Sequence, residues 1–550
     1  MAHIDRLCQT RPWATPSSWR RVWWVRLCLT GWLAMAIAVD GSSADDGPAQ
    51  DLAFFAAEAA TFAGHTAARM PYLAADAPAT VHIISRQDLE AFGAFHLWDA
   101  LRGTPGMDVV AAGGGHGLVG IRGLTKVGNN RILILLDGRR ISDTDSESLT
   151  WGSLPIPTRE IERIEVVEGP ASALYGGNAL TGVINIISRS PNRPHAPSSQ
   201  QVSAMLGDHR TNRAGWSGSG QLDGHGWRLG LEGERLGRFD ATEDAARAFK
   251  VHASLRGGLS RGTSYRLHTG VSRQEGDVSL GFLGPATELG SRAFLRTDID
   301  HGPWHSDVHL YGGRKELTSA PDAGETRFSS GQITLQRRWQ LEPGDLVLGG
   351  EVRRDAVDNL LVDVGQTLYA LYGEQRVDLH HRVDLWASAR LDHHPLAGTQ
   401  FSPRLSLVGR PIDHHTIRFS AGAAFRHPTL LENHLQLAGA FDVSGIETSG
   451  LIDTVEFSTM GNPALDPERM RFVEFAHQFL MGGLTTQMTA YHYHLSKVFA
   501  IGMVRNTLPR PGVVRTEFSI VNGSQTRAQG AEIGWRASWG RRWEGRGSYS

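Results

Sequence analysis

Regular alternation of apolar and polar residues most constrains what this chain can fold into, and it recurs from about residue 200 to the end. Across 383–392 the apolar residues are Val383, Leu385, Ala387, Ala389 and Leu391, and the residues between them are Asp384, Trp386, Ser388, Arg390 and Asp392. Segments 227–232 and 416–423 alternate in the same way. A period of two indicates β-strands with two unlike faces. A soluble sandwich would bury the apolar face in a core, whereas a membrane barrel exposes it to lipid and keeps polar residues in its lumen.

The spacing of these segments favours the barrel. About seventeen of them have the roughly ten residues that a tilted membrane strand needs. Short connections are predicted at 223–226, 260–262, 342–344, 380–381, 411–415 and 481–483, and long ones at 237–247, 274–290, 318–327, 355–366 and 427–469. Short periplasmic turns and long external loops are typical of outer-membrane barrels. We therefore predict an all-β transmembrane β-barrel.

Composition excludes two other classes. The formal charge of −2 argues against a dedicated nucleic-acid binder. The mean hydropathy of −0.25 excludes a bundle of membrane helices but not a barrel, because barrel strands show only alternate residues to lipid. The 64 glycines also favour many strands and turns.

The N-terminus reads as a secretory signal peptide over residues 1–44. Arg20, Arg21 and Arg26 precede an apolar run from Leu27 to Val39, and a small-residue cleavage site follows at 42–44. A single membrane anchor is the alternative, although roughly thirteen apolar residues are short for spanning. The two cysteines, at positions 8 and 28, lie inside this leader, so the mature chain would lack thiols. Residues 45–78 are expected to be a flexible lead-in.

Residues 119–187 predict a compact domain of short strands and glycine turns. The run 132–136 is too short for a membrane helix and fits a strand buried on both faces. Asp137-Gly138 after it predicts a hairpin. Charged and apolar residues interleave over 161–168, as in a half-buried strand. Ahead of this region, Thr80–Ser85 predicts a strand, and Ser85 with Asp88 predicts a helix N-cap.

The order of motifs in this domain resembles one family. I-R-G is followed by L-L-D-G, then I-E-R-I-E-V-V-E-G-P-A-S-A-L-Y-G, then G-V-I-N-I-I, within about seventy residues. This order resembles the plug domain of TonB-dependent outer-membrane receptors. The resemblance implies an α+β plug inside the lumen of a barrel that has 22 strands in the family. Further segments match receptor barrels in order: S-P-R-L-S-L, A-F-R-H-P-T, G-N-P-A-L-D-P-E and V-N-G-S-Q-T-R-A-Q-G-A-E-I.

The resemblance divides the chain into a plug at 79–190, a Pro/Ser-rich hinge at 191–199 and a barrel at 200–550. Family members continue for several strands beyond the point that matches Ser550. The seventeen strands are an odd number, and an open barrel would leave unpaired strand edges in lipid. We therefore expect a truncated or frameshifted reading frame and an incomplete barrel.

The family's partners follow from the same resemblance. A short box near the mature N-terminus pairs with the periplasmic TonB protein by adding a strand. The candidate here is Glu58-Ala59-Ala60-Thr61-Phe62-Ala63, with an ordinary linker as the alternative. TonB, outer-membrane lipid and a small metal chelate are the expected partners, and nucleic acid is not.

Two sets of residues are candidates for function. The first would hold the plug to the barrel through ion pairs, or pair within the plug: Arg122, Arg139, Arg163, Glu165 and Glu168. The second is histidines that would ligate haem iron from each side: His116 on the plug with His427 or His434 on the barrel. The adjacent pairs at 380–381, 393–394 and 414–415 resemble metal sites, but neighbouring strand residues face opposite ways, which favours solvated turns.

The resemblance implies a receptor that imports a scarce metal chelate, most simply a ferric siderophore. A haem or cobalamin receptor and a truncated fragment that binds without transport are the alternatives. No H-E-x-x-H, phosphate loop or nucleophile elbow occurs in the sequence. The glycines at 113–115 lack the context of a phosphate cradle. We therefore expect no enzyme activity, no cofactor and no resident metal.

Overall fold

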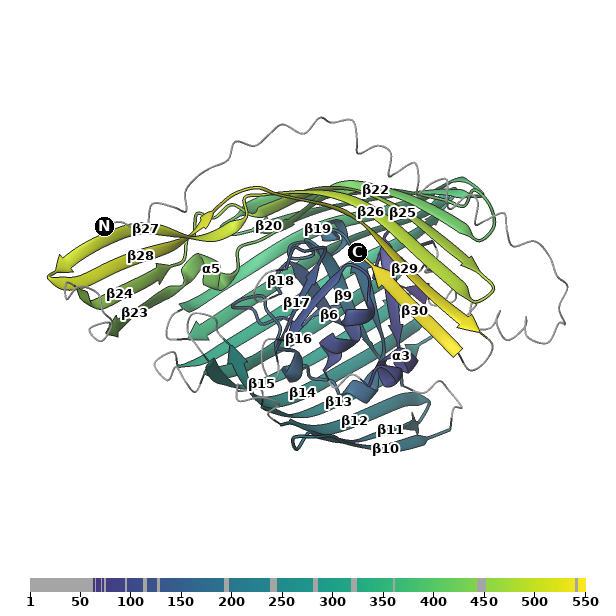
Figure 1. Ribbon diagram of the computed structural model, residues 1–550. Helices are drawn as coiled ribbons and strands as arrows, with labels where there is room; N and C mark the ends of the chain where they lie inside the picture. The colour runs from purple at the N-terminus through teal and green to yellow at the C-terminus, as the bar shows by residue number, and fades with distance from the viewer. Residues whose placement is uncertain are drawn as a thin grey trace. The chain divides into compact units, whose positions relative to one another are not determined.

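The computed structural model describes residues 63–64, 66–70, 72–73, 76–93, 96–111, 116–125, 129–191, 197–237, 245–279, 285–317, 324–359, 362–442, 452–539 and 543–550. The predicted signal peptide at 1–44 and most of the lead-in lie outside these residues. The described residues, from 63 to 550, belong to one compact unit. Within it, a large curved sheet surrounds a smaller domain (Figure 1).

The large sheet has 17 strands, and we refer to it as the wall. Its strands, in sheet order, are β10 (Ser199–Leu206), β11 (Asn212–Leu222), β12 (His225–Leu236), β13 (Ala246–Ser260), β14 (Thr263–Ser279), β15 (Pro285–His301), β16 (Trp304–Leu317), β17 (Glu325–Leu341), β18 (Gly344–Asn359), β19 (Val362–His380), β20 (Val383–His394), β21 (Gly398–Gly409), β22 (His415–Arg426), β25 (Glu468–Met481), β26 (Leu484–Ser496), β29 (Thr526–Trp539) and β30 (Trp543–Tyr549). The described strands of the wall pair antiparallel with their neighbours, as predicted for an all-β wall.

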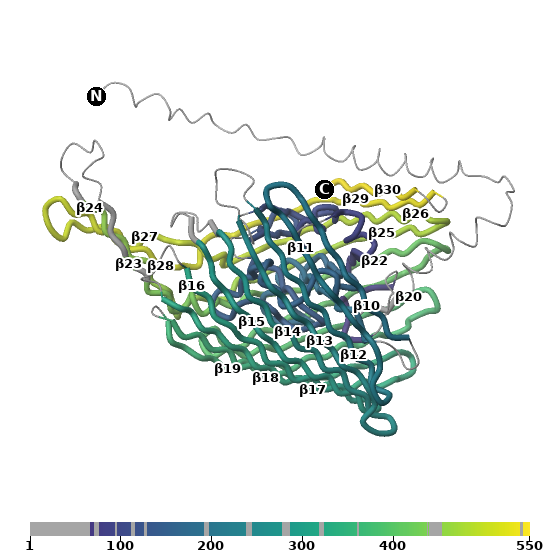
Figure 2. The backbone as a smooth tube through the Cα atoms, turned by 90° about the horizontal axis from the view of Figure 1, so that it is seen from below, coloured from purple at the N-terminus to yellow at the C-terminus, as the bar shows by residue number. Residues whose placement is uncertain are grey.

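The predicted alternation is confirmed in the wall, but the inward face is buried rather than solvated. In β20, Asp384 and Arg390 are buried, whereas Leu391 is 46% exposed on the outer face. In β12, Arg228 and Glu232 are buried in the same way. These polar residues of the lumen side are buried because the plug packs against them. Strands running side by side around the plug are visible in Figure 2.

The six predicted short connections are confirmed as turns between wall strands. Two of the predicted long connections were wrong. Most of 274–290 belongs to β14 and β15, which pair from Thr263↔His301 to Ser279↔Pro285. Most of 355–366 belongs to β18 and β19, which pair as far as Asn359↔Val362. Hydrogen bonds between neighbouring strands extend both pairs beyond the segments with regular alternation.

A second sheet contains the four strands β23 (Gln436–Asp442), β24 (Ile452–Met460), β28 (Gly512–Asn522) and β27 (Phe499–Arg510), in that order. The β24–β28 pair is parallel and joins two separate excursions of the chain from the wall. The first excursion also contains helix α5 (Leu430–His434). The predicted long loop at 427–469 is therefore largely structured.

The smaller domain, which we call the plug, contains a five-stranded sheet in the order β3, β8, β9, β6, β7. Its elements are β3 (Thr80–Ser85), α3 (Arg86–Ala91), the 3-10 helix η2 (Leu97–Gly103), β4 (Met107–Ala111), β5 (Gly117–Ile121), β6 (Ile132–Leu136), β7 (Arg139–Arg140), the 3-10 helices η3 (Trp151–Ser153) and η4 (Thr158–Glu160), β8 (Ile161–Glu168), α4 (Ser172–Tyr175) and β9 (Gly182–Ser188). Ahead of it, β1 (Ala63–Gly64) pairs with β2 (Tyr72–Leu73).

Local sequence signals explain this domain. β6 is buried along its whole length, as predicted. Asp137 and Gly138 both have positive φ, at 52° and 80°, which is the geometry of the tight hairpin that joins β6 to β7. Ser85 and Asp88 form the predicted reciprocal cap on α3. The prediction of a half-buried β8 was wrong, because its last five residues are buried between sheet neighbours and the wall.

The core lies at the contact between plug and wall. One apolar cluster combines plug residues such as Ile134 and Ile184 with Phe294, Tyr311 and Phe328 of the wall. In the part of the chain that the structure describes, no helix has the length and apolar character needed to cross a membrane.

Candidate functional site

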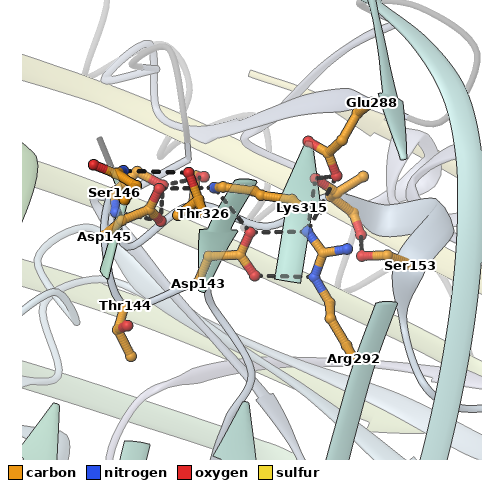
Figure 3. A network of polar contacts seen from close by, with 12 residues as sticks. Asp143, Thr144, Asp145, Ser146, Ser153, Glu288, Arg292, Lys315 and Thr326 are labelled. Carbon is orange, nitrogen blue, oxygen red and sulfur yellow. Dashed lines mark hydrogen bonds and ion pairs between the residues drawn. The ribbon is translucent and has the colours of Figure 1, made fainter. Parts of the chain in front are cut away.

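The plug and the wall meet through several buried polar clusters, and we take this interface as the candidate site. The first cluster is centred on Asp143, which follows the β6–β7 hairpin (Figure 3). Arg292 of β15 donates from Nε to Asp143 Oδ1 at 3.0 Å and from Nη2 to Oδ2 at 2.8 Å. Lys315 of β16 lies 3.2 Å from Asp143 and 2.8 Å from Asp145. Burial alone would raise the pKa of Asp143, but Arg292 and Lys315 hold it well below its usual range.

His116 lies at the edge of this cluster, immediately before β5. Its Nε2 is 3.9 Å from Oε2 of Glu288, near the start of β15. Burial lowers the pKa of His116, so the ring is neutral at pH 7. Glu288 in turn accepts from Arg292 Nη2 at 3.2 Å. His116 therefore faces a carboxylate and an arginine that are already paired.

The second cluster surrounds Arg122, which follows β5. Its guanidinium donates to Glu532 Oε1 at 2.8 Å, to Glu474 Oε1 at 2.5 Å and to Glu168 Oε2 at 3.1 Å. Tyr493 of β26 also contacts it. Glu168 belongs to the plug and pairs with His82 at 3.1 Å, whereas Glu474 and Glu532 belong to the wall strands β25 and β29. One buried guanidinium is thus shared by three carboxylates from both domains.

The pKa values of Arg122 and Glu168, the two plug residues in this group of ion pairs, follow from their shared contacts. Burial opposes the charged form of Arg122, but Tyr493, Glu474 and Glu168 raise its pKa well above the usual value. Burial would raise the pKa of Glu168, and His82 and Arg122 lower it instead. Arg122 therefore connects the two domains directly, because it contacts one carboxylate of the plug and two of the wall.

The other predicted coupling residues behave differently. Arg163 pairs with Glu165 at 2.7 Å, two residues along the same strand, so this ion pair lies within the plug. Arg139 is buried, and its guanidinium lies over the Phe294 ring of the wall, 3.0 Å from the ring centroid. None of its nitrogens has a hydrogen-bond partner among the described residues. The expected ion pair from Arg139 to the wall was therefore wrong. Burial lowers its pKa well below the usual value.

The predicted histidines of the barrel half lie near α5. His427 follows β22 and stacks on His394, the last residue of β20, with ring centroids 4.6 Å apart. Neither ring nitrogen of His427 has a hydrogen-bond partner in the described part of the chain. His434 is the last residue of α5 and is partly exposed. The contacts of His116 and His427 place them against β15 and β20, which β16 to β19 separate in the sheet.

The adjacent histidine pairs divide into two kinds. His380 and His381 are exposed at the turn after β19, and His414 is exposed before β22, as predicted. His394 is buried, because it packs under His427. The residues Glu58 to Phe62 of the candidate TonB box lie outside the described residues, and Ala63 begins β1.

Sequence reasoning missed Asp143, Arg292, Lys315, Glu474 and Glu532. The alternation of β15 does place Glu288 and Arg292 on the inward face together with Phe294 and Asp298. No pattern in the sequence pairs an inward wall residue with a particular plug residue, because that pairing depends on how the two domains dock.

Comparison with known proteins supports the architecture. The chain is 28% identical over 463 residues to an iron-regulated outer membrane virulence protein of Vibrio cholerae O395, covering 78% of this chain and 67% of that protein. It is 39% identical over 127 residues to a vitamin B12 transporter of Vibrio vulnificus, covering 23% of this chain and 20% of that protein. The fold matches the siderophore receptor PirA of Pseudomonas aeruginosa with a TM-score of 0.69 and 21% identity, covering 84% of this chain and 83% of that structure.

Sequence profiles of two domains also match, in the order expected. Residues 74–183 match the TonB-dependent receptor plug domain, and residues 170–550 match the TonB-dependent receptor-like β-barrel. These two matches cover the plug and the wall described above. The chain belongs to the family of TonB-dependent receptors.

Proposed function

We propose that this chain is an outer-membrane receptor of a Gram-negative bacterium that takes up a ferric siderophore. The family membership supports a receptor rather than an enzyme. Among the similar proteins, one is named as iron-regulated and another as a siderophore receptor. The exposed apolar residues on the outer face of the wall fit a lipid surround.

The observation that carries this proposal is a plug fixed inside the wall by buried ion pairs. Passage of a ligand through such a lumen requires the plug to move or to change shape. Breaking a buried pair by removing one partner costs about 3–5 kcal/mol, which exceeds thermal energy several-fold. An external source of work therefore fits this architecture, and TonB acting on the segment at 58–63 would supply it by adding a strand. In this proposal Arg122 and Glu168 couple plug to wall.

Uptake measurements test the proposal. The full-length chain is expressed in a host that lacks its own iron receptors, and uptake of radioactive iron is followed with a catecholate or hydroxamate siderophore. We expect accumulation that disappears in a host without TonB. Accumulation that is independent of TonB, or absent with every siderophore, would contradict the proposal. Binding to purified protein without uptake would identify a binding module instead.

Haem is the second candidate, and the His394–His427 stack is the observation that favours it. Three ring nitrogens of this pair have no hydrogen-bond partner among the described residues. Neutral imidazole is an axial ligand of haem iron. Haem binding to the purified chain would be compared with His116→Ala, His427→Ala and His434→Ala variants. Unchanged affinity in all three would exclude haem ligation by these residues. Cobalamin, the cargo named for one similar protein, serves as the third ligand in the same assay.

A further inference from the structure

A third polar cluster at the plug–wall interface differs from the two described above, because several of its buried polar atoms have no hydrogen-bond partner among the described residues. Asp137 is at the tip of the β6–β7 hairpin, and His252 and His268 lie on the adjacent wall strands β13 and β14. Among the residues that the structure describes, they are the one group of three possible metal ligands whose ligand atoms all lie within 4.8 Å of one another. The group joins one plug residue to two wall residues.

The unsatisfied atoms of this cluster point to a missing partner. His252 is completely buried, and neither of its ring nitrogens has a hydrogen-bond partner in the described chain. Nδ1 of His268 and Oδ2 of Asp137 are also unpaired, and both are buried. A buried polar group without a hydrogen-bond partner destabilises the folded chain. Four such atoms in one place are unusual for a packed interface.

The distance between the ligand atoms fits two ligands of one metal ion better than it fits a direct hydrogen bond. His268 Nδ1 and Asp137 Oδ2 are 3.6 Å apart, which is too long for a hydrogen bond between them. Two ligands of a tetrahedral zinc ion, with bonds of about 2.0–2.2 Å, lie about 3.4 Å apart. The rings of His252 and His268 are 6.1 Å apart at their centroids, so both can turn a nitrogen toward the same point.

The plug holds the carboxylate in place from behind. Asp137 Oδ1 accepts a hydrogen bond from the Ser188 backbone N–H at 2.7 Å, which leaves Oδ2 toward the histidines. The Gly138 N–H donates to Asn185 Oδ1 at 3.0 Å, which fixes the hairpin tip. A carboxylate that hydrogen bonds hold in place from behind is what a metal site needs.

A cavity lies beside the cluster. Asp137 and His268 line this cavity of about 850 Å³ between plug and wall, together with residues at wall turns such as Gly302 and Pro303. Other charged groups act on the two histidines: Arg139, Arg228, Arg266, Arg296 and Asp298. Arg296 is paired with Asp298, and Arg139 lies over Phe294. The cavity therefore provides space next to two of the three members of the cluster.

We propose that Asp137, His252 and His268 form a binding site for a transition-metal ion of the zinc type, which fastens the plug hairpin to wall strands β13 and β14. Two neutral imidazoles and one carboxylate suit such an ion, with a fourth position for water. This ion is a resident of the interface and not the transported cargo. The site goes beyond the proposed uptake function and does not depend on which chelate is carried.

Zinc binding to the full-length chain tests the site. The protein is purified in detergent from outer membranes, stripped with a chelator and titrated with Zn²⁺ in a calorimeter, with Co²⁺ absorption as a report on tetrahedral coordination. We expect one strong site per chain. Asp137→Asn, His252→Gln and His268→Gln should each weaken it by at least about 100-fold, because each removes a ligand.

His309→Gln is the matched control. His309 is a buried inward histidine of β16 whose Nδ1 is also unpaired, but it does not belong to the cluster. We expect its zinc affinity to equal that of the parent. The Asp137→Asn variant keeps the size of the side chain and the bond from Ser188, so its fold is checked by circular dichroism and heat-modifiable migration.

Each possible result either supports the proposed zinc site or contradicts it. Loss of the site in a folded Asp137→Asn variant, with retention in His309→Gln, supports the proposal. Absence of strong zinc binding in the parent, or equal loss in His309→Gln, overturns it. Because the readout is metal binding, failure of this proposal leaves siderophore uptake to be judged by its own assay.

Discussion

The interface between plug and wall has two contrasting regions. Around Arg122, a buried guanidinium contacts three carboxylates from both domains. Around Asp137, a carboxylate and two histidines face one another without hydrogen bonds. The first region is saturated with partners, whereas four polar atoms of the second have no hydrogen-bond partner among the described residues. Saturation indicates a structural connection that is complete in the chain itself, whereas the unsaturated region needs a further component. The experiments below test this difference, from the largest expected effect to the smallest.

Removing Arg122 should have the largest effect. Arg122→Met leaves Glu168, Glu474 and Glu532 buried around a group without charge, so we expect a loss of about 3–5 kcal/mol in stability. Denaturant unfolding of the purified chain, with proteolysis of the plug as a second readout, measures it. Arg102→Met is the control, because its pair with Asp99 is exposed and should contribute at most about 1 kcal/mol. Equal effects of the two variants would remove the contrast.

Loss of Arg292 should have an intermediate effect. Arg292→Gln removes two charged hydrogen bonds to Asp143 but leaves Lys315 beside that carboxylate. We expect a loss of about 1.5–3 kcal/mol, smaller than for Arg122, because one cation remains. The same unfolding assay measures it. A loss as large as that of Arg122→Met would mean that Lys315 does not compensate.

Glu532→Gln tests whether the three carboxylates of the first region share the charge of Arg122. Three carboxylates share one guanidinium, so neutralising one of them should change stability by less than about 1 kcal/mol in the parent. In the Arg122→Met background the same change should restore about 1–3 kcal/mol, because it removes an unpaired charge. A double-mutant cycle on the unfolding free energy gives both numbers. Purely additive effects would contradict the shared arrangement.

The hairpin at the second region gives a smaller effect than the loss of Arg122 or Arg292. Gly138→Ala forces a side chain onto a residue with φ of +80°, at a cost of about 1–2 kcal/mol. Gly409→Ala is the control, since that glycine has no positive φ and no neighbour within 4 Å of an added Cβ. Thermal unfolding compares the two. A destabilisation by Gly409→Ala that matches Gly138→Ala would show that backbone strain is not the cause.

The smallest effect concerns pH. The pKa of Asp143 is lower in the folded chain than its unfolded value of about 3.9. Its contribution is therefore complete above that value and disappears as the pH falls through the folded pKa, because the unfolded state binds the proton first. The stability difference between the parent and Asp143→Asn should be constant from pH 8 to about pH 5 and shrink in stronger acid. A difference that changes near pH 6.5 would implicate His116 instead.

The sequence predicts the wall and the plug well because both follow local rules. The alternation in β20 and the Asp137-Gly138 turn depend on period and backbone geometry, which neighbouring residues determine. The sequence does not reveal the strands at 436–442 and 452–460, because the second of them pairs with residues 512–522 on a separate excursion of the chain. It also fails for Arg139, which was expected to form an ion pair and instead lies over an aromatic ring. These outcomes depend on docking between distant segments.

The candidate site also contains some residues that the sequence predicts and others that only the docking of distant segments brings together. Arg122 and Glu168 stand at motif positions and can be named from the sequence, but Glu474 and Glu532 come from strands more than three hundred residues later. His252 and His268 carry no motif, since two histidines sixteen positions apart meet only because β13 and β14 pair with Ser254 opposite His268. Register between strands, which propensity does not encode, decides which inward residues become neighbours.

The alternation of the wall also restricts how the length of this chain can change. Side chains on a strand switch face at every step, so one inserted or deleted residue within β20 would send Arg390 outward and Leu391 inward, along with every residue up to the next turn. An exchange of one residue disturbs one position, whereas a shift of one residue inverts a whole strand. Insertions and deletions are therefore confined to the connections, and related sequences should differ in loop length while their strands keep a constant count of residues.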